Sequence, residues 1–348
     1  MSPQLQPLLS VVIPNWNGAA YLERCLQSLQ RQEYPSREIL VVDNGSTDAS
    51  LEITERIAPD AIVIRHERNQ GFAAAVNAGI RAAGGEWIAV LNNDTEAAPS
   101  WLAEWACGIE RHPEAAFFAC RILDMKTRSQ VYSAGDCFLR TGIGYRRGQD
   151  QPDCAEYGAE RETFSACACA ALYRKSVLHE LQGFDSRFFA YLEDVDIGLR
   201  LRAAGYKGFY LPSALIYHHG SATAGGEFSA LSVRLRTRNA VLVLLKSLPA
   251  SILWRCAPMI ASAQLSWMAR ALAHARLLSY LRGLAGVVPL IPHALAERRR
   301  QQSLWHKNSS RMWQDILNSE ALAREDYQRT GVNPPSAFLK WYFRKFAR

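Results

Sequence analysis

Two acidic clusters contain the side chains of this 348-residue chain that are best suited to catalysis, Asn92-Asn93-Asp94 and Glu193-Asp194. The first directly follows an apolar run that predicts a buried strand, so its polar groups lie where the chain leaves a sheet. A carboxylate in that position can bind Mg²⁺ or Mn²⁺, with diphosphate oxygens and water as the other ligands. Such a cation would offset the charge on a leaving diphosphate. Asn and Asp are also common turn formers, so a simple turn remains the alternative for the first cluster.

The second cluster belongs to a segment with three acids in four residues, Glu193, Asp194 and Asp196. If a helix begins at Asp194, its N-terminus stabilises the carboxylates, and Asp196 can pair with Arg200 one turn later. We expect one carboxylate to act as a general base toward a hydroxyl group; an acidic helix start without catalytic function is the alternative. His218 follows another short apolar run and is a candidate metal ligand, with a hydrogen-bonded surface histidine as the alternative.

The elements that must position these residues alternate between strand and helix. Apolar β-branched runs predict strands, and apolar residues spaced three to four apart predict helices, in the order strand 8–14, helix 19–32, strand 38–43, helix 46–58, strand 61–65, helix 72–83 and strand 86–91. This alternation is typical of a parallel sheet with helices on both faces. Further along, the sequence predicts helices over 99–111 and 194–204, two short strands at 208–211 and 215–218, and a loop over 141–148.

Polar residues gather at the predicted carboxyl ends of the strands, where open α/β sheets bind their ligands. Asn15 and Asn17 follow the first strand, Asp43 ends the second, and residues 92–94 follow the fourth. Asp43 can bond a pyrimidine ring or a ribose hydroxyl, and a turn over residues 43–46 explains it equally well when it is taken alone. The first strand is not followed by GxGxxG or by a phosphate-binding lysine loop, so two common nucleotide-binding motifs are excluded.

Charge divides the chain into two parts. Residues 1–230 contain 21 Lys or Arg and 28 Asp or Glu, a net charge of −7, whereas residues 231–348 contain 19 and 5, a net charge of +14. Such a basic part suits nucleic acid or an anionic membrane surface, or forms a solvated basic face. Because no nucleic-acid-binding signature accompanies it, we expect no nucleic-acid partner.

The apolar stretches of the basic part are interrupted by arginines, and none reaches 18 uncharged apolar residues. We therefore expect amphipathic helices in the plane of a membrane interface rather than a transmembrane span, with Trp254 and Trp267 at the boundary. A helical subdomain packed on the sheet is the alternative. The first residues lack the pattern of a signal peptide and the eight cysteines form no CxxC pair, so we expect a cytosolic protein without a zinc cluster or a disulfide framework.

Ordered segments of the chain resemble the inverting glycosyltransferase family 2, and within it the rhamnosyltransferase-like branch. They span about residues 8–225 and read VVIPNWNG at 11–18, VVDNGSTD at 41–48, NQGFAAAVN at 69–77, LNNDT at 91–95, FFAYLEDVD at 188–196 and YHHGS at 217–221. The resemblance implies an α/β GT-A fold over residues 1–228, followed by a helical, basic region over 229–348. It also implies a nucleoside-diphosphate sugar donor and Mg²⁺ or Mn²⁺.

The resemblance assigns roles to individual residues. Asp94 is expected to bind the metal together with His218, and Asp194 of the Glu193-Asp194 pair is expected to be the catalytic base. Asn92 stands where the family's metal motif begins with Asp, so this site has one carboxylate fewer and a modest metal affinity is expected. Donor-nucleotide contacts are expected from Pro14, Asn15, Asn17, Asp43, Asn69, Gly71, Asn77, Asn92 and Asn93, with Asp43 at the base.

The resulting prediction is an inverting glycosyltransferase of cell-surface polysaccharide synthesis. Its donor is a nucleoside-diphosphate sugar, with dTDP-rhamnose as the first choice, and its acceptor is a hydroxyl of a glycan or of a polyprenyl-diphosphate-linked oligosaccharide. It would be cytoplasmic and peripheral on the inner face of the cell membrane. The alternative is a catalytically inactive nucleotide-sugar-binding protein of the same fold.

Overall fold

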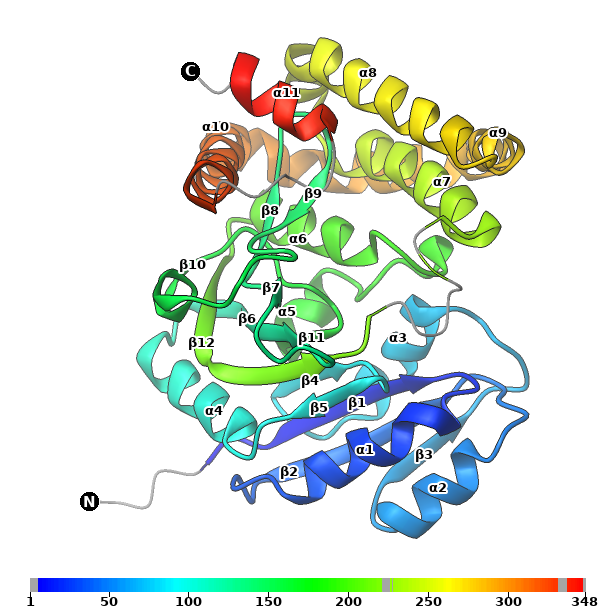
Figure 1. Cartoon of the computed structure of the whole chain (residues 1–348), viewed down its shortest axis with the longest axis vertical. Coiled ribbons are helices and arrows are strands. Elements are labelled where there is room, and N and C mark those ends of the chain that lie inside the picture. The colour runs from blue at the N-terminus through cyan, green and yellow to red at the C-terminus, as the bar shows by residue number, and fades with distance from the viewer. Residues whose placement is uncertain (1–5, 221–225, 227, 331–336, 347–348) are drawn as a thin grey trace.

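The N-terminal half of the chain has the predicted alternation of strands and helices (Figure 1). The computed structural model describes residues 6–220, 226, 228–330 and 337–346. The first elements are β1 (Leu9–Asn15), α1 (Ala19–Gln30), β2 (Arg37–Asp43), α2 (Ser50–Ile57), β3 (Ile62–Arg65), α3 (Phe72–Ala82), β4 (Trp87–Leu91), β5 (Thr95–Ala97), α4 (Trp101–Arg111) and β6 (Ala115–Asp124). The remaining strands and short helices of this half are β7 (Val131–Ser133), β8 (Asp136–Phe138), β9 (Gly144–Arg146), η1 (Ala155–Gly158), β10 (Arg161–Glu162), β11 (Ala170–Arg174), α5 (Lys175–Glu180), η2 (Ser186–Phe188), α6 (Glu193–Ala203) and β12 (Lys207–His218).

A ten-stranded mixed sheet lies at the centre, with its main path in the order β10-β12-β6-β11-β4-β1-β2-β3. Strands β4, β1, β2 and β3 run parallel, and β6 runs parallel to β12, while β11 is antiparallel to both β4 and β6. The carboxyl ends of β1, β2 and β4 therefore meet at one edge, as the sequence predicts.

Helices cover both faces of the sheet because its strands alternate their apolar side chains between two cores. On β1, Leu9, Val11 and Ile13 pack with α1 and α4, whereas Val12 faces the core that contains α3. Helix α3 approaches closely: a Cβ built at Gly79 would lie 2.2 Å from a methyl group of Val12. This close packing fixes the segment that leads into α3, which contributes to the site below.

The helices of the C-terminal region stack above the sheet domain (Figure 1) and comprise α7 (Ala230–Ser247), α8 (Ala250–Ala273), α9 (Leu277–Ala285), η3 (Val288–Leu290), α10 (Ile291–Thr330) and α11 (Ala337–Phe346). They share a buried core with α6 through residues such as Leu199, Leu242 and Met312. One segment, Leu277–Trp305, is long and apolar enough to cross a membrane by length and composition alone, with a mean hydropathy of 1.2. It is divided among α9, η3 and the start of α10, and 22% of the 18-residue stretch that meets this criterion is buried.

Two local predictions were wrong. Residues 207–218 form one strand, β12, whose register against β6 shifts between Leu211 and Leu215; the sequence split it because Pro212 and Ser213 interrupt the apolar pattern. The predicted loop over 141–148 contains β9, which pairs with β8. Its Gly-rich sequence resembles a loop, but antiparallel pairing with the preceding strand β8 satisfies its backbone groups.

Candidate active site

The carboxyl ends of β1, β2 and β4 are joined by a buried amide network. The Asn93 side-chain amide donates to Asn15 Oδ1 at 2.7 Å. The amide of Asn15 in turn donates to Ser46 Oγ at 3.2 Å and to Asp43 Oδ1 at 3.4 Å. These bonds fix the three strand ends relative to one another at the floor of the site.

A second network orders the segment before α3. The Asn44 amide donates to Asn69 Oδ1 at 3.0 Å and to the Gly71 carbonyl at 3.1 Å. Gly71 has a φ of 90°, and a Cβ there would lie 2.5 Å from the Phe189 carbonyl oxygen, so only glycine fits. Asn44 was not among the predicted site residues, although its position directly after β2 places it at the ligand-binding edge of the sheet.

The predicted metal ligands lie together. His218 Nε2 is 3.1 Å from Asp94 Oδ1, and both side chains are buried. Burial raises the pKa of Asp94, but the hydrogen bond and charge of His218 outweigh it, so the pKa lies below its usual value. The Tyr132 ring packs edge-on against His218, with ring centroids 4.5 Å apart. Asp94 is therefore an anion held against an imidazole at the end of β12.

The Glu193-Asp194 pair opens α6, one residue earlier than the predicted helix. Asp194 Oδ1 accepts from the Val195 N–H at 2.8 Å and Oδ2 from the Ala168 N–H at 3.4 Å. Burial raises the pKa of Asp194, and these backbone bonds oppose the rise. Burial and the neighbouring Asp194 raise the pKa of Glu193 to about 8. Near neutral pH, Asp194 is thus the better candidate for the ionised base.

One cavity of about 550 Å³ joins these groups, within the usual size of a ligand pocket. Asn17, Asp43 and Asn77 are not among its described lining residues. Asn17 Oδ1 accepts from the Thr47 N–H at 2.8 Å, and Asn77 bonds both backbone groups of Phe184 at 2.6 and 2.9 Å. Contact of these three with a donor stays a prediction. The predicted residues that line the cavity are Pro14, Asn15, Asn69, Gly71, Asn92, Asn93, Asp94, Glu193, Asp194 and His218.

The structure adds three residues beside Asp194 that the sequence analysis did not select. One ligand atom from each of Asp136, Cys167 and Asp194 lies within 4.8 Å of the others. Burial and the Asp194 charge raise the pKa of Asp136 to about 7. Arg146, opposite Asp136 in the β8–β9 pair, lies over the Tyr132 ring at 4.3 Å. No periodicity or motif marks these positions, because Asp136 and Arg146 come to the cavity through the β8–β9 pair and Cys167 through the segment before β11.

A divalent cation fits better at Asp94 and His218 than at the Asp136–Cys167 group. Mg²⁺ and Mn²⁺ prefer oxygen ligands, and a thiol suits softer metals. His218 Nδ1 is buried and has no hydrogen-bond partner in the described part of the chain, so the ring is not committed to a second protein group. Asp94 and His218 would hold the cation, and diphosphate oxygens and water would complete its ligands.

Comparisons with known proteins identify the family and the fold of the chain. Residues 10–182 match the profile of Glycosyl transferase family 2. The N-acetylglucosaminyl-diphospho-decaprenol L-rhamnosyltransferase of Mycobacterium tuberculosis is 28% identical over 249 residues, which cover 63% of this chain and 78% of that protein. Among solved structures, TarS 1-349 of S. aureus has a TM-score of 0.54 at 17% identity and covers 93% of this chain and 92% of its own.

A mannosyltransferase from Pyrobaculum calidifontis, solved with GDP-Man and Mn²⁺, has a TM-score of 0.50 at 17% identity over 92% of this chain and 87% of that one. At such identities the two structures establish the fold alone, which is GT-A. The profile match covers the strand ends that hold Asn15, Asp43 and Asp94. The chain belongs to glycosyltransferase family 2 and is a glycosyltransferase with a GT-A fold.

Proposed function

We propose that the chain transfers a sugar, with inversion, from a nucleoside-diphosphate donor to a hydroxyl group of a glycan or a polyprenyl-diphosphate-linked acceptor in cell-surface polysaccharide synthesis. The observation that supports this most is that one cavity is lined by both the Asp94–His218 pair and the Glu193-Asp194 pair. The first pair suits a diphosphate with its cation, and the second suits an acceptor hydroxyl.

In the proposed mechanism, the hydroxyl oxygen of the acceptor attacks the anomeric carbon of the donor, and Asp194 takes the proton of that hydroxyl. The diphosphate leaves from the opposite side of that carbon, so the configuration inverts. A cation bound at Asp94 and His218 would neutralise charge on the leaving diphosphate. Glu193, whose pKa is raised to about 8, stays protonated beside Asp194 and does not compete with it for the proton. Polar side chains at the strand ends, among them Asn15 and Asn93, orient the nucleotide.

The base assignment is tested with Asp194→Asn and with Asp60→Asn as a control at an exposed loop acid. Hydrolysis of the donor in Mn²⁺ serves as the assay, because water then takes the place of the acceptor hydroxyl and gives its proton to the same base. We expect Asp194→Asn to lose at least about a hundredfold in kcat, as is typical of lost base catalysis, with donor binding retained. Wild-type turnover by Asp194→Asn would show that the base is another residue.

We propose dTDP-rhamnose as the donor, which is supported by the similarity to a rhamnosyltransferase. A thermal-shift screen of dTDP-, UDP- and GDP-sugars with Mn²⁺ tests it. The dTDP-sugar should give the largest shift, and the shift should fall when Mn²⁺ is replaced by a chelator. A larger shift with another nucleotide would replace this donor. Absence of Mn²⁺-dependent hydrolysis with every donor would favour the inactive nucleotide-sugar-binding alternative.

We also propose that the protein is cytoplasmic and peripheral on the inner membrane face, where it docks on anionic lipid. Residues 228–296 contain eight Lys or Arg and no Asp or Glu. Large apolar side chains are exposed on the same helices, and Trp254 is 81% exposed. Helices that carry both exposed apolar side chains and arginines suit an anionic bilayer. These apolar side chains include Trp254, Leu265, Met268, Leu272, Leu277, Leu278, Leu281, Leu284, Val288, Ile291 and Leu295.

Flotation with vesicles that contain phosphatidylglycerol tests this surface. The double variant Leu278→Glu/Leu281→Glu should stay with the soluble fraction, whereas wild type should float. Ile62→Glu, at an exposed position on β3, is the control and should float as wild type does. Equal flotation of the double variant and wild type would refute the assigned surface.

A further inference from the structure

The segment between η2 and α6 has an unusual backbone directly before the acidic pair. Phe189, Tyr191 and Leu192 have φ values of 66°, 71° and 66°, a region that non-glycine residues avoid unless their surroundings impose it. Leu192 is the N-cap of α6, so the next two residues are Glu193 and Asp194. The position of Asp194 therefore depends on whatever holds this segment.

Helix α7 of the C-terminal region holds it through one buried amide. Asn239 is 0% exposed. Its Nδ2 donates to three carbonyls of the segment, those of Phe188 at 3.0 Å, Ala190 at 2.8 Å and Tyr191 at 2.7 Å. One –NH₂ group has two hydrogens, so these bonds are shared among three carbonyls that all point at one atom. An amide nitrogen can bond to all three of these oxygens, whereas a carboxylate or an aliphatic side chain cannot.

Arg238 orients that amide. Its Nε donates to Asn239 Oδ1 at 2.9 Å, which leaves the nitrogen of the amide toward the segment. Its Nη2 donates to the carbonyls of Arg187 at 3.0 Å and Phe188 at 2.7 Å. The two adjacent α7 side chains thus bond to the carbonyls of Arg187, Phe188, Ala190 and Tyr191.

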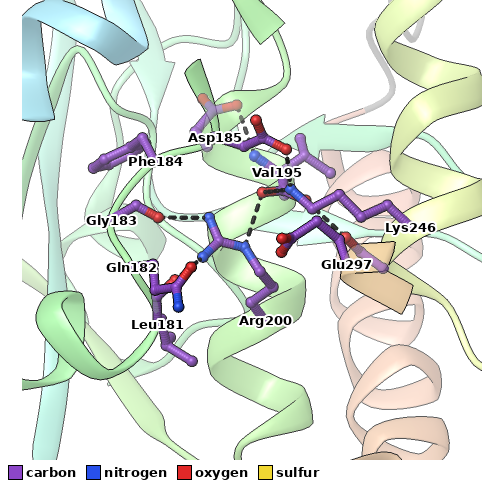
Figure 2. Close-up of polar contacts among 12 residues, drawn as sticks. Leu181, Gln182, Gly183, Phe184, Asp185, Val195, Arg200, Lys246 and Glu297 are labelled. Carbon is purple, nitrogen blue, oxygen red and sulfur yellow. Dashed lines mark hydrogen bonds and ion pairs between the residues drawn. The ribbon is translucent and has the colours of Figure 1, made fainter. Parts of the chain in front are cut away.

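Two turns along α7, Lys246 anchors the flanks of the same segment (Figure 2). Its Nζ lies 2.7 Å from Asp185, just before η2, and 2.8 Å from Asp196 in the first turn of α6. Arg200 also bonds Asp196, at 2.9 Å, and reaches back to the Gly183 carbonyl at 2.8 Å. The segment is therefore held at both ends and in the middle by groups that lie outside the family 2 profile match, which ends at residue 182.

We propose that Asn239 is a positioning residue for Asp194, so that α7 of the C-terminal region is a working part of the catalytic site. The proposal rests on the proposed function in one respect, the role of Asp194 as base. Without the amide, the carbonyls of Ala190 and Tyr191 lose their side-chain donor and that of Phe188 keeps only Arg238, so the segment relaxes toward ordinary φ values. The base would then move relative to the acceptor oxygen, and displacements of about 1 Å cost roughly a hundredfold in rate.

The test compares Asn239→Asp, which keeps the shape but lacks both N–H donors, with Met312→Ala. Met312 is fully buried in the core of the C-terminal helices and forms no hydrogen bond with the segment. The assay is Mn²⁺-dependent hydrolysis of the nucleotide sugar that gives the largest thermal shift among dTDP-, UDP- and GDP-sugars. Asn239→Asp should lose at least about tenfold in kcat with the donor KM within about twofold. Met312→Ala should keep its kcat at a temperature where it is folded.

Arg238→Ala provides a second variant, since Arg238 is only half-buried and its loss leaves a foldable chain. We expect an intermediate loss in kcat, at an unchanged donor KM. If either variant folds and retains wild-type kcat, or loses only donor affinity, the positioning role is refuted. Asp194→Asn separates the two claims: if it is active, the base assignment fails, and if it is inactive while Asn239→Asp is active, the positioning role alone fails.

Discussion

The ionic cluster behind the acidic pair gives the sharpest stability prediction, the effect of Lys246→Met. The Lys246 side chain is 1% exposed and its Nζ bridges Asp185 and Asp196, which are 10% and 0% exposed. Lys246 and Arg200 are the two permanent cations beside these carboxylates. In Lys246→Met, Asp196 keeps Arg200, whereas Asp185 loses its lysine and keeps the hydrogen bond of His293 Nε2 at 2.8 Å. Breaking a buried pair in this way costs about 3–5 kcal/mol. For a chain of this size that corresponds to a fall in Tm of roughly 5–10 °C.

The effect of Lys246→Met on stability depends on pH through the carboxylates of Asp185 and Asp196. Burial raises the pKa of Asp185 and of Asp196, but the cations around them outweigh it, so both lie below the usual value. A lowered pKa contributes stability that is present above about pH 4 and is lost as the pH falls. In Lys246→Met the unpaired charge is relieved by protonation. The Tm difference from wild type should therefore be largest at pH 7 and shrink toward pH 4.

A double-mutant cycle with Asp196→Asn measures whether the Lys246–Asp196 ion pair is responsible for the loss of stability. Calorimetry of wild type, Lys246→Met, Asp196→Asn and the double variant should give a coupling free energy of about 1–3 kcal/mol, because contacting residues are not additive. Additivity within about 0.5 kcal/mol would refute the reasoning. So would a Tm difference that does not change between pH 7 and pH 4.

Three further predictions concern the cavity. Asp94→Asn should remove the Mn²⁺ dependence of donor hydrolysis and reduce kcat at least about a hundredfold; Mn²⁺ titration measures both, and an unchanged Mn²⁺ requirement would contradict the role given to Asp94 and His218. Gly71→Ala should destabilise the protein by about 1–3 kcal/mol and raise the donor KM, because its Cβ would lie 2.5 Å from the Phe189 carbonyl oxygen; a wild-type melting curve and KM would show that the segment yields easily. Asp136→Asn should raise Tm more at pH 8 than at pH 5. Burial and the Asp194 charge raise the pKa of Asp136 to about 7, so wild type loses stability between about pH 4 and pH 7, where the unfolded chain releases a proton that the folded chain keeps. Equal gains in Tm at the two pH values would contradict this.

The sequence predicted the part of the site that local patterns encode. Apolar runs that end in Asn15, Asp43 and Asn92 mark parallel strands, and parallel strands bring their carboxyl ends to one edge. The bonds from Asn93 to Asn15 and from Asn15 to Asp43 confirm that these ends meet. The predicted helix over 19–32 is likewise present as α1, with Leu22, Leu26 and Leu29 fully buried.

The rest depends on contacts between distant segments, which periodicity does not reveal. Asp136 and Arg146 reach the cavity only because β8 and β9 form a hairpin. Asn239 follows an Arg-rich stretch that favours a surface helix by charge, yet it is fully buried against backbone carbonyls fifty residues earlier. A buried amide satisfied by backbone groups has no signature in its own neighbourhood, because its partners are carbonyls that any residue can supply.

The family resemblance selected Asp194 as the base, but the local sequence pattern alone does not distinguish it from Glu193. Two adjacent carboxylates have the same local sequence and the same helix N-terminus. The structure distinguishes them, because Asp194 accepts N–H groups from Val195 and from Ala168, twenty-six residues away. Glu193 Oε2 is buried and has no partner within the described residues. Hydrogen bonds to the charged form of a carboxylate favour its ionisation, and burial without such bonds opposes it. Asp194 is therefore the ionised member of the pair and Glu193 the protonated one. Only the ionised Asp194 can take the proton of the acceptor hydroxyl.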